Sequence, residues 1–183
     1  MRIISGKYKS RKLVFKKSQE LRPTQDRVKE SIFNIIASKI SDSTCLDLFA
    51  GSGSLGFEAI SRGAKRVDFV DVDVEYVKKN HILLKEDSAA NIFRTNALSF
   101  LKNKQSQYDI IFLDPPWKHL HFFDRSLKAI FEFDILKKNG IVVCEHPVKI
   151  FEFYSFNVIN QKTFGDKTVS ILEILNEKSI ISG

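Results

Sequence analysis

Cysteine and long apolar runs are scarce in this 183-residue sequence, and each scarcity excludes a class of protein. The two cysteines, Cys45 and Cys144, lie in separate apolar stretches without Cys-x-x-Cys spacing, so we expect neither a disulfide framework nor a metal site. No apolar stretch approaches the length that spans a bilayer, and the apolar part of the N-terminus is too short for a signal peptide. Internal repeats and low-complexity linkers are missing too. These absences predict a cytoplasmic protein with reduced core thiols and no membrane contact.

The positive charge of the chain is concentrated near its N-terminus. Residues 1–30 contain ten Lys and Arg against three acidic residues, which equals the whole net charge of +7, so residues 31–183 are balanced. A basic segment attached to a neutral domain predicts a polyanionic partner, of which nucleic acid is the commonest. A solvated basic tail without a partner is the alternative.

Apolar residues within this basic segment argue against a free tail. Ile3, Ile4, Tyr8, Leu13 and Val14 form two strand-like pieces, which predict a basic β-hairpin within a leader of residues 1–20. Thr24 can cap a helix that follows, and apolar residues at helical spacing extend that helix to residue 40. The candidate RNA-binding residues are Arg2, Lys7, Lys9, Arg11, Lys12, Arg22 and Arg27. We also expect the remaining domain, residues 21–183, to fold without residues 1–16.

From residue 44 onward, apolar strand-like stretches alternate with helical ones. Expected strands span 44–49, 67–71, 91–95, 108–113 and 140–145, and expected helices span 54–62, 74–85, 98–102 and 122–136. Two further strands, 154–160 and 169–175, are joined through Gly165-Asp166 and predict an antiparallel hairpin. The pattern predicts an α/β fold with a Rossmann-like, mostly parallel seven-stranded sheet and helices on both faces.

A glycine-rich turn and several carboxylates follow the strands of this predicted sheet. Gly51, Gly53 and Gly56 after the first strand satisfy the G-x-G-x-x-G spacing, and Asp71 ends the second strand. Such sheets bind ligands at the carboxyl ends of their strands, where Asp47 and Asp114 also fall. A pyrophosphate avoids such carboxylates, whereas S-adenosylmethionine carries a sulfonium, an ammonium and a ribose diol. The electrostatics therefore favour S-adenosylmethionine over NAD.

The segment Asp114-Pro115-Pro116-Trp117 follows the apolar stretch 108–113. Two prolines end the strand, stiffen the loop and remove two N–H donors. The remaining carbonyls and carboxylate are acceptors, and a large flat ring follows them. This combination suits a planar nucleobase with an exocyclic amine, because the acceptors bind the amine and the indole stacks on the base. A proline-rich turn with a surface tryptophan is the structural alternative.

Several motifs together resemble the bacterial enzymes that methylate guanine N2 in 16S ribosomal RNA. The resemblance rests on RIISGKYKSRKL (2–13), LRPTQDRVKESIFNII (21–36), DLFAGSGSLGFEAISRGA (47–64), VDVD (70–73), NALSF (96–100) and LDPPW (113–117). The glycine loop and DPPW are shared by many amino-group methyltransferases, whereas the leader and first helix make the match family-specific.

The resemblance implies roles for particular residues. Residues 21–183 would form a methyltransferase domain that begins with helix 21–40. The implied cofactor-binding residues are Asp47, Phe49, Gly51, Gly53, Gly56, Asp71, Asn96 and Ala97. Asp47 would orient the ammonium, directly or through water, Asp71 would accept the ribose hydroxyls and Asn96 would bind the adenine edge. Asp114, Pro115 and Trp117 would form the catalytic set, with Trp117 stacked on a flipped guanine and the other two accepting its N2 hydrogens.

The expected function is therefore methyl transfer from S-adenosylmethionine to a guanine N2 in 16S rRNA, by a monomer that acts on a small-subunit particle. Two alternatives stay open. An amino-group methyltransferase acting on DNA adenine N6, cytosine N4 or protein would share DPPW and differ in the leader. The other is a non-catalytic RNA-binding protein or an NAD-linked enzyme, which binding of S-adenosylmethionine by the isolated protein would exclude.

Overall fold

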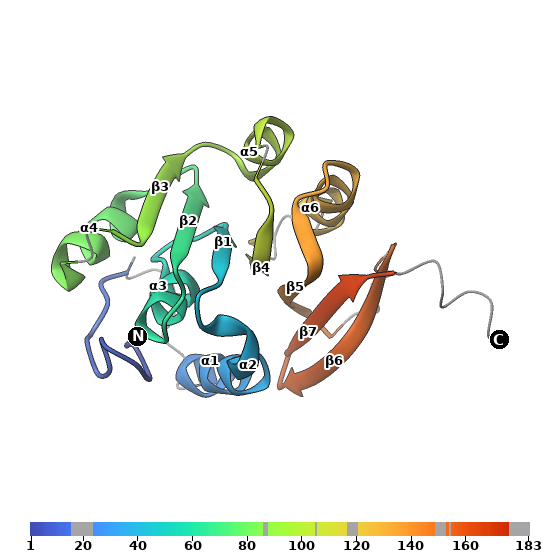
Figure 1. Cartoon of the computed structure of the whole chain (residues 1–183). Coiled ribbons are helices and arrows are strands. Elements are labelled where there is room, and N and C mark those ends of the chain that lie inside the picture. The colour runs from blue at the N-terminus through green and yellow to red at the C-terminus, as the bar shows by residue number, and fades with distance from the viewer. Residues whose placement is uncertain are drawn as a thin grey trace.

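A computed structural model describes residues 1–15, 24–85, 88–104, 106–116, 121–148, 153 and 155–175, with side chains of the first helix from Asp26 onward. A single sheet runs through this part of the chain (Figure 1). Its strands are β1 (Thr44–Leu48), β2 (Arg66–Asp71), β3 (Ala90–Arg94), β4 (Tyr108–Leu113), β5 (Leu136–Pro147), β6 (Phe156–Phe164) and β7 (Lys167–Ile174). They lie in the order β3-β2-β1-β4-β5-β7-β6. The first five pair in parallel, and β7 pairs antiparallel with β5 and β6.

Two apolar layers cover the two faces of the sheet. The helices are α1 (Thr24–Ile35), α2 (Ala37–Ile40), α3 (Ser54–Ser61), α4 (Glu75–Leu84), α5 (Ala97–Asn103) and α6 (His121–Glu132). Successive strand residues point to opposite faces, so Cys45 packs in the layer of α1 to α4 and Leu46 in the layer of α5 and α6. The near-continuous apolar strands follow from this burial on both sides.

The structure confirms the expected sheet and corrects two helices. The helix expected over 122–136 ends at Glu132, because Asp134 adopts left-handed backbone (φ 52°) and the chain enters β5 at Leu136. The helix expected over 24–40 is interrupted at Ile36, which separates α1 from the short α2.

Residues 1–15, the described part of the basic leader, form a looped hairpin rather than two regular strands. One antiparallel bridge joins Arg2 and Lys12, and the chain between them turns through loop hydrogen bonds. Ile3 and Leu13 are buried in the same apolar cluster as α1 and α3. The leader therefore packs on the domain as part of its core, beside α3 in Figure 1.

The strand order reverses between β1 and β4. Ligands of open α/β sheets bind outside the carboxyl ends of the strands at such a reversal. Within the described ranges, no helix has the length and apolarity that crossing a membrane requires.

Candidate active site

The loop after β1 has the tight backbone that a nucleoside site requires. Phe49, Gly51 and Gly53 all adopt left-handed backbone, with φ of 62°, 55° and 76°. A Cβ atom on Gly56 would lie 2.2 Å from the Phe69 ring and 2.9 Å from Asp47 Oδ2, so α3 approaches the sheet this closely because residue 56 is glycine. The N-terminal N–H groups of α3 consequently face the carboxyl end of β1, where they favour an electronegative ligand atom.

Asp47 lies behind this loop. Its Oδ2 accepts a hydrogen bond from the Gly56 N–H at 2.9 Å, and the residue is 3% exposed. Burial raises the pKa of Asp47 to about 8, although the Gly56 hydrogen bond opposes the shift, and the nearby Asp71 charge raises it further. This burial favours the water-mediated form of the expected contact with an ammonium group.

Asp71 reaches the same loop from β2. Its two oxygens accept hydrogen bonds from the Gly51 N–H at 2.8 Å and the Asp73 N–H at 2.9 Å. The carboxylate is partly exposed, so it borders the space outside the strand ends. A ribose diol placed there could reach a fixed acceptor.

Asn96 and Ala97 begin α5, after β3. The Asn96 Oδ1 caps the helix by accepting a hydrogen bond from the Ser99 N–H at 2.8 Å. This cap orients the exposed amide, whose NH2 group remains a donor suited to an adenine ring nitrogen. Ala97 is buried at the first turn of the helix.

Asp114 directly follows β4, and its neighbour in the sheet is acidic. Leu113 pairs with Cys144 in the register of β4 and β5, so Asp114 aligns with Glu145. Burial and the Glu145 charge raise the pKa of Asp114 well above its usual value, while Lys167 opposes the shift. Pro115 is buried beside it. Trp117, the third expected catalytic residue, lies outside the described residues.

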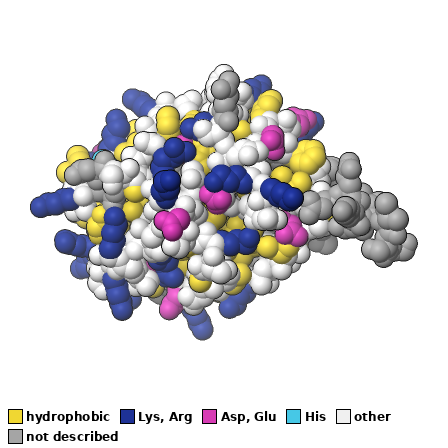
Figure 2. Space-filling model, viewed as in Figure 1, with side chains coloured by type: hydrophobic (Ala, Val, Ile, Leu, Met, Phe, Trp, Pro, Cys, Tyr) yellow, Lys and Arg dark blue, Asp and Glu magenta, His cyan; other side chains and the backbone are white. Residues whose placement is uncertain are grey.

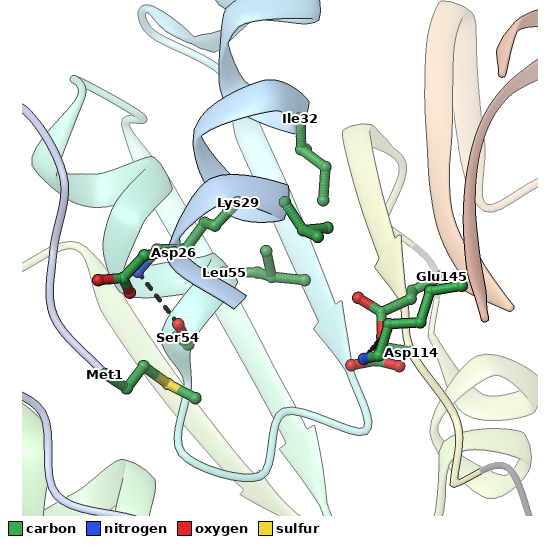
Figure 3. Close-up of a pocket in the computed structure, with 10 residues that line it drawn as sticks. Met1, Asp26, Lys29, Ile32, Ser54, Leu55, Asp114 and Glu145 are labelled. Carbon is green, nitrogen blue, oxygen red and sulfur yellow. Dashed lines mark hydrogen bonds and ion pairs between the residues drawn. The ribbon is translucent and has the colours of Figure 1, made fainter. Parts of the chain in front are cut away.

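A pocket opens beside Asp114 (Figure 3). The leader, α1, the start of α3 and the ends of β4, β5 and β7 line it, with Met1, Lys29, Leu55, Asp114, Glu145 and Lys167 among the lining residues. Asp114 and Glu145 lie close together at one end, and Met1, Asp26 and Ser54 lie at the other. The cavity has a volume of about 100 Å3, which is smaller than typical small-ligand sites of about 300–1,000 Å3.

The expected RNA-binding residues divide into those the structure describes and one it does not. Arg2, Lys7, Lys9, Arg11, Lys12 and Arg27 are exposed. Arg2 also forms an ion pair with Asp26, with Nε 3.2 Å from Oδ2. Arg22 lies outside the described residues. The exposed set is therefore presented on the leader and α1, where a polyanion can reach it.

Lys29 differs from the other basic residues of this region. It is 4% exposed, and its Nζ lies 3.2 Å from Glu58 Oε2 and donates to the Arg2 carbonyl at 2.5 Å. Burial lowers the pKa of Lys29, although Glu58 opposes the shift. Lys29 thus contributes a buried ion pair rather than a surface charge for RNA.

Sequence reasoning missed the pocket residues Glu145 and Lys167. Glu145 follows the buried stretch 140–144 as Asp114 follows β4, so the rule that located Asp114 could have located it. Lys167 opens a hairpin strand and has no local signal. Its place beside Glu145 depends on the antiparallel pairing of β7 with β5.

The chain is similar to known proteins over nearly its whole length. A family model described as "Conserved hypothetical protein 95" matches residues 1–173. Ribosomal RNA small subunit methyltransferase D of Haemophilus influenzae is 44% identical over 151 residues, which cover 79% of this chain and 78% of that protein. The putative rRNA methyltransferase YlbH of Bacillus subtilis is 40% identical over 160 residues, covering 82% and 84%.

Solved structures confirm the fold. The putative methyltransferase yhhF from Escherichia coli superposes with a TM-score of 0.85 at 32% identity, covering 97% of this chain and 99% of that chain. The Rossmann-like methyltransferase fold expected from the sequence is thus confirmed. With a family model matching residues 1–173 and a relative 44% identical, the chain belongs to the conserved hypothetical protein 95 family, the family of the ribosomal RNA small subunit methyltransferase D proteins.

Proposed function

We propose that this protein transfers a methyl group from S-adenosylmethionine to the exocyclic N2 amine of a guanine in small-subunit ribosomal RNA. The observation that carries the proposal is the position of Asp114-Pro115-Pro116 at the end of β4, next to the glycine loop at the reversal of strand order. The names of the relatives, which include small-subunit rRNA methyltransferases, support the choice of RNA.

The carboxylates around the glycine loop support S-adenosylmethionine as the methyl donor. The charge of Asp71 acts on Asp47, and that of Asp47 acts on Asp114, so the three acids lie within electrostatic range of one another. A cationic ligand bound beside these acids would lower the raised pKa values of Asp47 and Asp114 and favour their charged forms, whereas a pyrophosphate would raise both pKa values further. We assign the ribose hydroxyls to Asp71 and the adenine edge to Asn96 and the Ala97 N–H. When bound, S-adenosylmethionine supplies an electrophilic methyl group.

The acceptors after β4 would act on the base. A conjugated amine is a weak nucleophile, and hydrogen bonds from its N–H groups to Asp114 and the Pro115 carbonyl direct its lone pair at the methyl carbon. As the nitrogen–carbon bond forms, the carbon–sulfur bond breaks and N2 loses one proton. Asp114 in its ionised form would accept that proton, because a raised pKa makes its carboxylate a stronger base. Trp117 would stack on the base.

The leader would hold the RNA. Exposed Arg and Lys side chains of residues 2–12 lie on the segment that reaches the pocket at Met1, so phosphates bound there bring a flipped base towards Asp114. We propose that a cytoplasmic monomer acts in this way on a small-subunit particle.

Labelled S-adenosylmethionine tests the proposal directly. The protein is incubated with small-subunit particles from cells that lack it, with naked 16S RNA, and with duplex DNA. We expect label in the particles, released on nucleoside digestion as N2-methylguanosine and mapped to one nucleotide. Label in DNA adenine or cytosine, or in ribosomal protein, would overturn the proposal in favour of another amino-group methyltransferase.

A further inference from the structure

Three polar side chains lie side by side at the pocket edge of the sheet. Asp114 follows β4, Glu145 aligns with it on β5, and Lys167 begins β7 opposite Pro147. Because β4, β5 and β7 are consecutive in the sheet, the edge presents a carboxylate, a carboxylate and an ammonium in that order. All three line the pocket, and Figure 3 shows Asp114 and Glu145 next to each other.

Glu145 and Lys167 form an ion pair in a partly dehydrated position. Their side chains are 15% and 20% exposed. The two charged groups lose much of their hydration in this position, so the ion pair contributes little net free energy to folding. Replacing such a pair by apolar residues of similar volume often leaves the free energy of unfolding unchanged or raises it. The Glu145 charge also helps to raise the pKa of Asp114. The position of the pair beside Asp114 is better explained by what the pocket binds.

Guanine presents a matching order of groups. Its Watson–Crick edge carries the N2 amine, the N1–H donor and the O6 acceptor in sequence, and flipped bases are read on this edge. A carboxylate accepts hydrogen bonds and an ammonium carries three donors. The order acceptor, acceptor, donor along the sheet edge is therefore complementary to guanine. Adenine opposes it, with an acceptor at N1 and an amine at position 6.

We propose that Glu145 and Lys167 select guanine, with Glu145 accepting the N1 hydrogen and Lys167 donating to O6 while Asp114 binds the N2 amine. This inference rests on the proposed function, since it takes a guanine to be the base in the pocket. It adds Glu145 and Lys167, as residues that determine base specificity, to Asp114, which binds the reacting amine. It also explains why a pocket with an Asp-Pro-Pro turn binds adenine poorly, since adenine has an acceptor at N1 and an amine at position 6.

The test replaces the target guanosine by 2,6-diaminopurine riboside, which keeps the N2 amine but has an acceptor at N1 and an amine at position 6. The modified RNA is assembled into small-subunit particles, and kcat/KM is measured for both bases. We expect the wild type to prefer guanosine by about 100-fold or more, because the mispaired groups lose their hydration without gaining partners. An inosine substrate, which lacks the N2 amine, gives the background.

Two variants test whether Glu145 and Lys167 cause the preference for guanosine over 2,6-diaminopurine riboside. Lys167→Met should lower kcat/KM for guanosine about 10- to 100-fold and reduce the guanosine preference by at least about 10-fold, since the donor to O6 is gone. Glu145→Gln should also reduce the preference, because an amide can turn either its carbonyl or its NH2 group towards N1. The matched control is Lys162→Met on the exposed part of β6, which should leave the preference unchanged.

Each outcome is decisive. A wild type that methylates the 2,6-diaminopurine substrate as well as guanosine would overturn the inference without any variant. Retention of the full preference by Lys167→Met and Glu145→Gln, with wild-type thermal stability and S-adenosylmethionine affinity, would overturn it too. If the wild type methylated no guanosine in any small-subunit RNA or particle, the proposed function itself would fail.

Discussion

Asp47 lies within β1, Asp71 ends β2 and Asp114 follows β4, and their surroundings give the three acids different properties. Asp47 is buried behind the glycine loop, and Asp71 is partly exposed and holds the backbone of that loop. Asp114 shares its pocket with a second carboxylate, Glu145. We therefore expect substitutions at the three positions to have separable effects. Asp47 should affect how stability depends on pH, Asp71 should affect cofactor binding, and Asp114 should affect methyl transfer to the substrate.

Replacing Asp71 by alanine should weaken S-adenosylmethionine binding. A hydrogen bond to a charged acceptor contributes about 1.5–3 kcal/mol, which corresponds to roughly 10- to 150-fold in affinity. The loss includes the hydrogen bond that fixes the Gly51 N–H. Calorimetric titration measures the effect, and Asp73→Ala, two residues away and exposed, is the matched control. Equal affinities for both variants would remove Asp71 from the site.

The stability of the protein should depend on the protonation of Asp47. Its pKa is about 8 in the folded protein against 3.8 ordinarily, so the folded protein keeps this proton between those values and the unfolded chain releases it. The free energy of unfolding therefore falls as pH rises across this window, by at most about 1.4 kcal/mol per pH unit. Asp47→Asn cannot titrate and should lack this component.

Urea unfolding of the wild type and Asp47→Asn at pH 5 and pH 8 measures the difference. The wild type should lose stability relative to the variant between the two pH values. A constant difference would mean that Asp47 is ionised throughout, and burial would then not dominate its pKa.

Replacing Asp114 by alanine should reduce methyl transfer by roughly 100-fold or more, because the variant can neither orient the amine nor accept its proton. S-adenosylmethionine affinity should change much less. Single-turnover transfer to RNA and cofactor titration separate these quantities. Asp124→Ala, an exposed acid in the first turn of α6, is the control. Full turnover by Asp114→Ala would refute the role assigned to the loop after β4.

At the scale of elements, the leader is fastened to two helices by polar contacts. The backbone N–H groups of Ile4 and Ser5 donate to the Glu58 carboxylate at 2.8 and 3.0 Å. On α4, Asn80 accepts from the Val14 N–H, and its amide donates to the carbonyls of Val14 and Ser52 at 2.9 Å. Ser52 belongs to the glycine loop, so one side chain joins the leader to the predicted cofactor site.

Deleting residues 1–15 should therefore destabilise the whole domain, contrary to the expectation from sequence that the domain folds alone. The deletion removes the buried side chains of Ile3 and Leu13, and the free energy of unfolding falls by about 1.5–3 kcal/mol for each. The buried Glu58 carboxylate also loses two donors, at about 1–3 kcal/mol each. The sum is comparable to the stability of a typical domain, about 5–15 kcal/mol.

Thermal and urea unfolding of the truncated chain measure this loss. Glu58→Gln keeps the leader but weakens its attachment, so it should be destabilised by a smaller amount. A truncated protein with the melting temperature of the wild type would show that the leader is a removable tail.

The sequence predicted elements better than the contacts between them. The bounds of β4 match the stretch 108–113, which is apolar apart from Asp109, and the carboxylate of Asp109 is partly exposed and paired with Lys137. The end of α6 depends on the left-handed backbone of Asp134, which no apolar pattern reports. The Lys29–Glu58 pair joins residues whose proximity is set by packing of α1 on α3, so no local pattern in the sequence predicts it.

At the scale of the whole molecule, basic side chains are spread widely over the face shown in Figure 2, with acidic ones among them. The leader differs because residues 2–12 carry five exposed basic residues and no acidic one. The net charge of the protein attracts RNA over a distance wherever the charges lie. A basic side chain that contacts a phosphate also releases the counterions bound to the RNA at that site. The salt dependence of RNA binding should therefore depend on where a charge is removed as well as on how many are removed.

A fourfold variant tests this point. Changing Lys7, Lys9, Arg11 and Lys12 to glutamine should reduce the log–log salt slope of RNA binding by roughly 2–3 units, if most of these charges contact single-stranded phosphates. The control removes four exposed lysines elsewhere, at positions 65, 102, 128 and 138, and so has the same net charge. Filter binding over a range of salt concentrations measures both slopes. Equal slopes would assign the effect to net charge and remove the leader as the RNA anchor.

The attachment of the leader also fixes an order of events during synthesis. Its anchors Glu58, Ser61 and Asn80 follow their partners by 53 to 66 residues along the chain. At about 5–20 residues per second, translation supplies them roughly 3–13 s after the leader. For that interval the most basic part of the nascent chain lacks the contacts that shape it. The protein therefore acquires its positive charge before its fold.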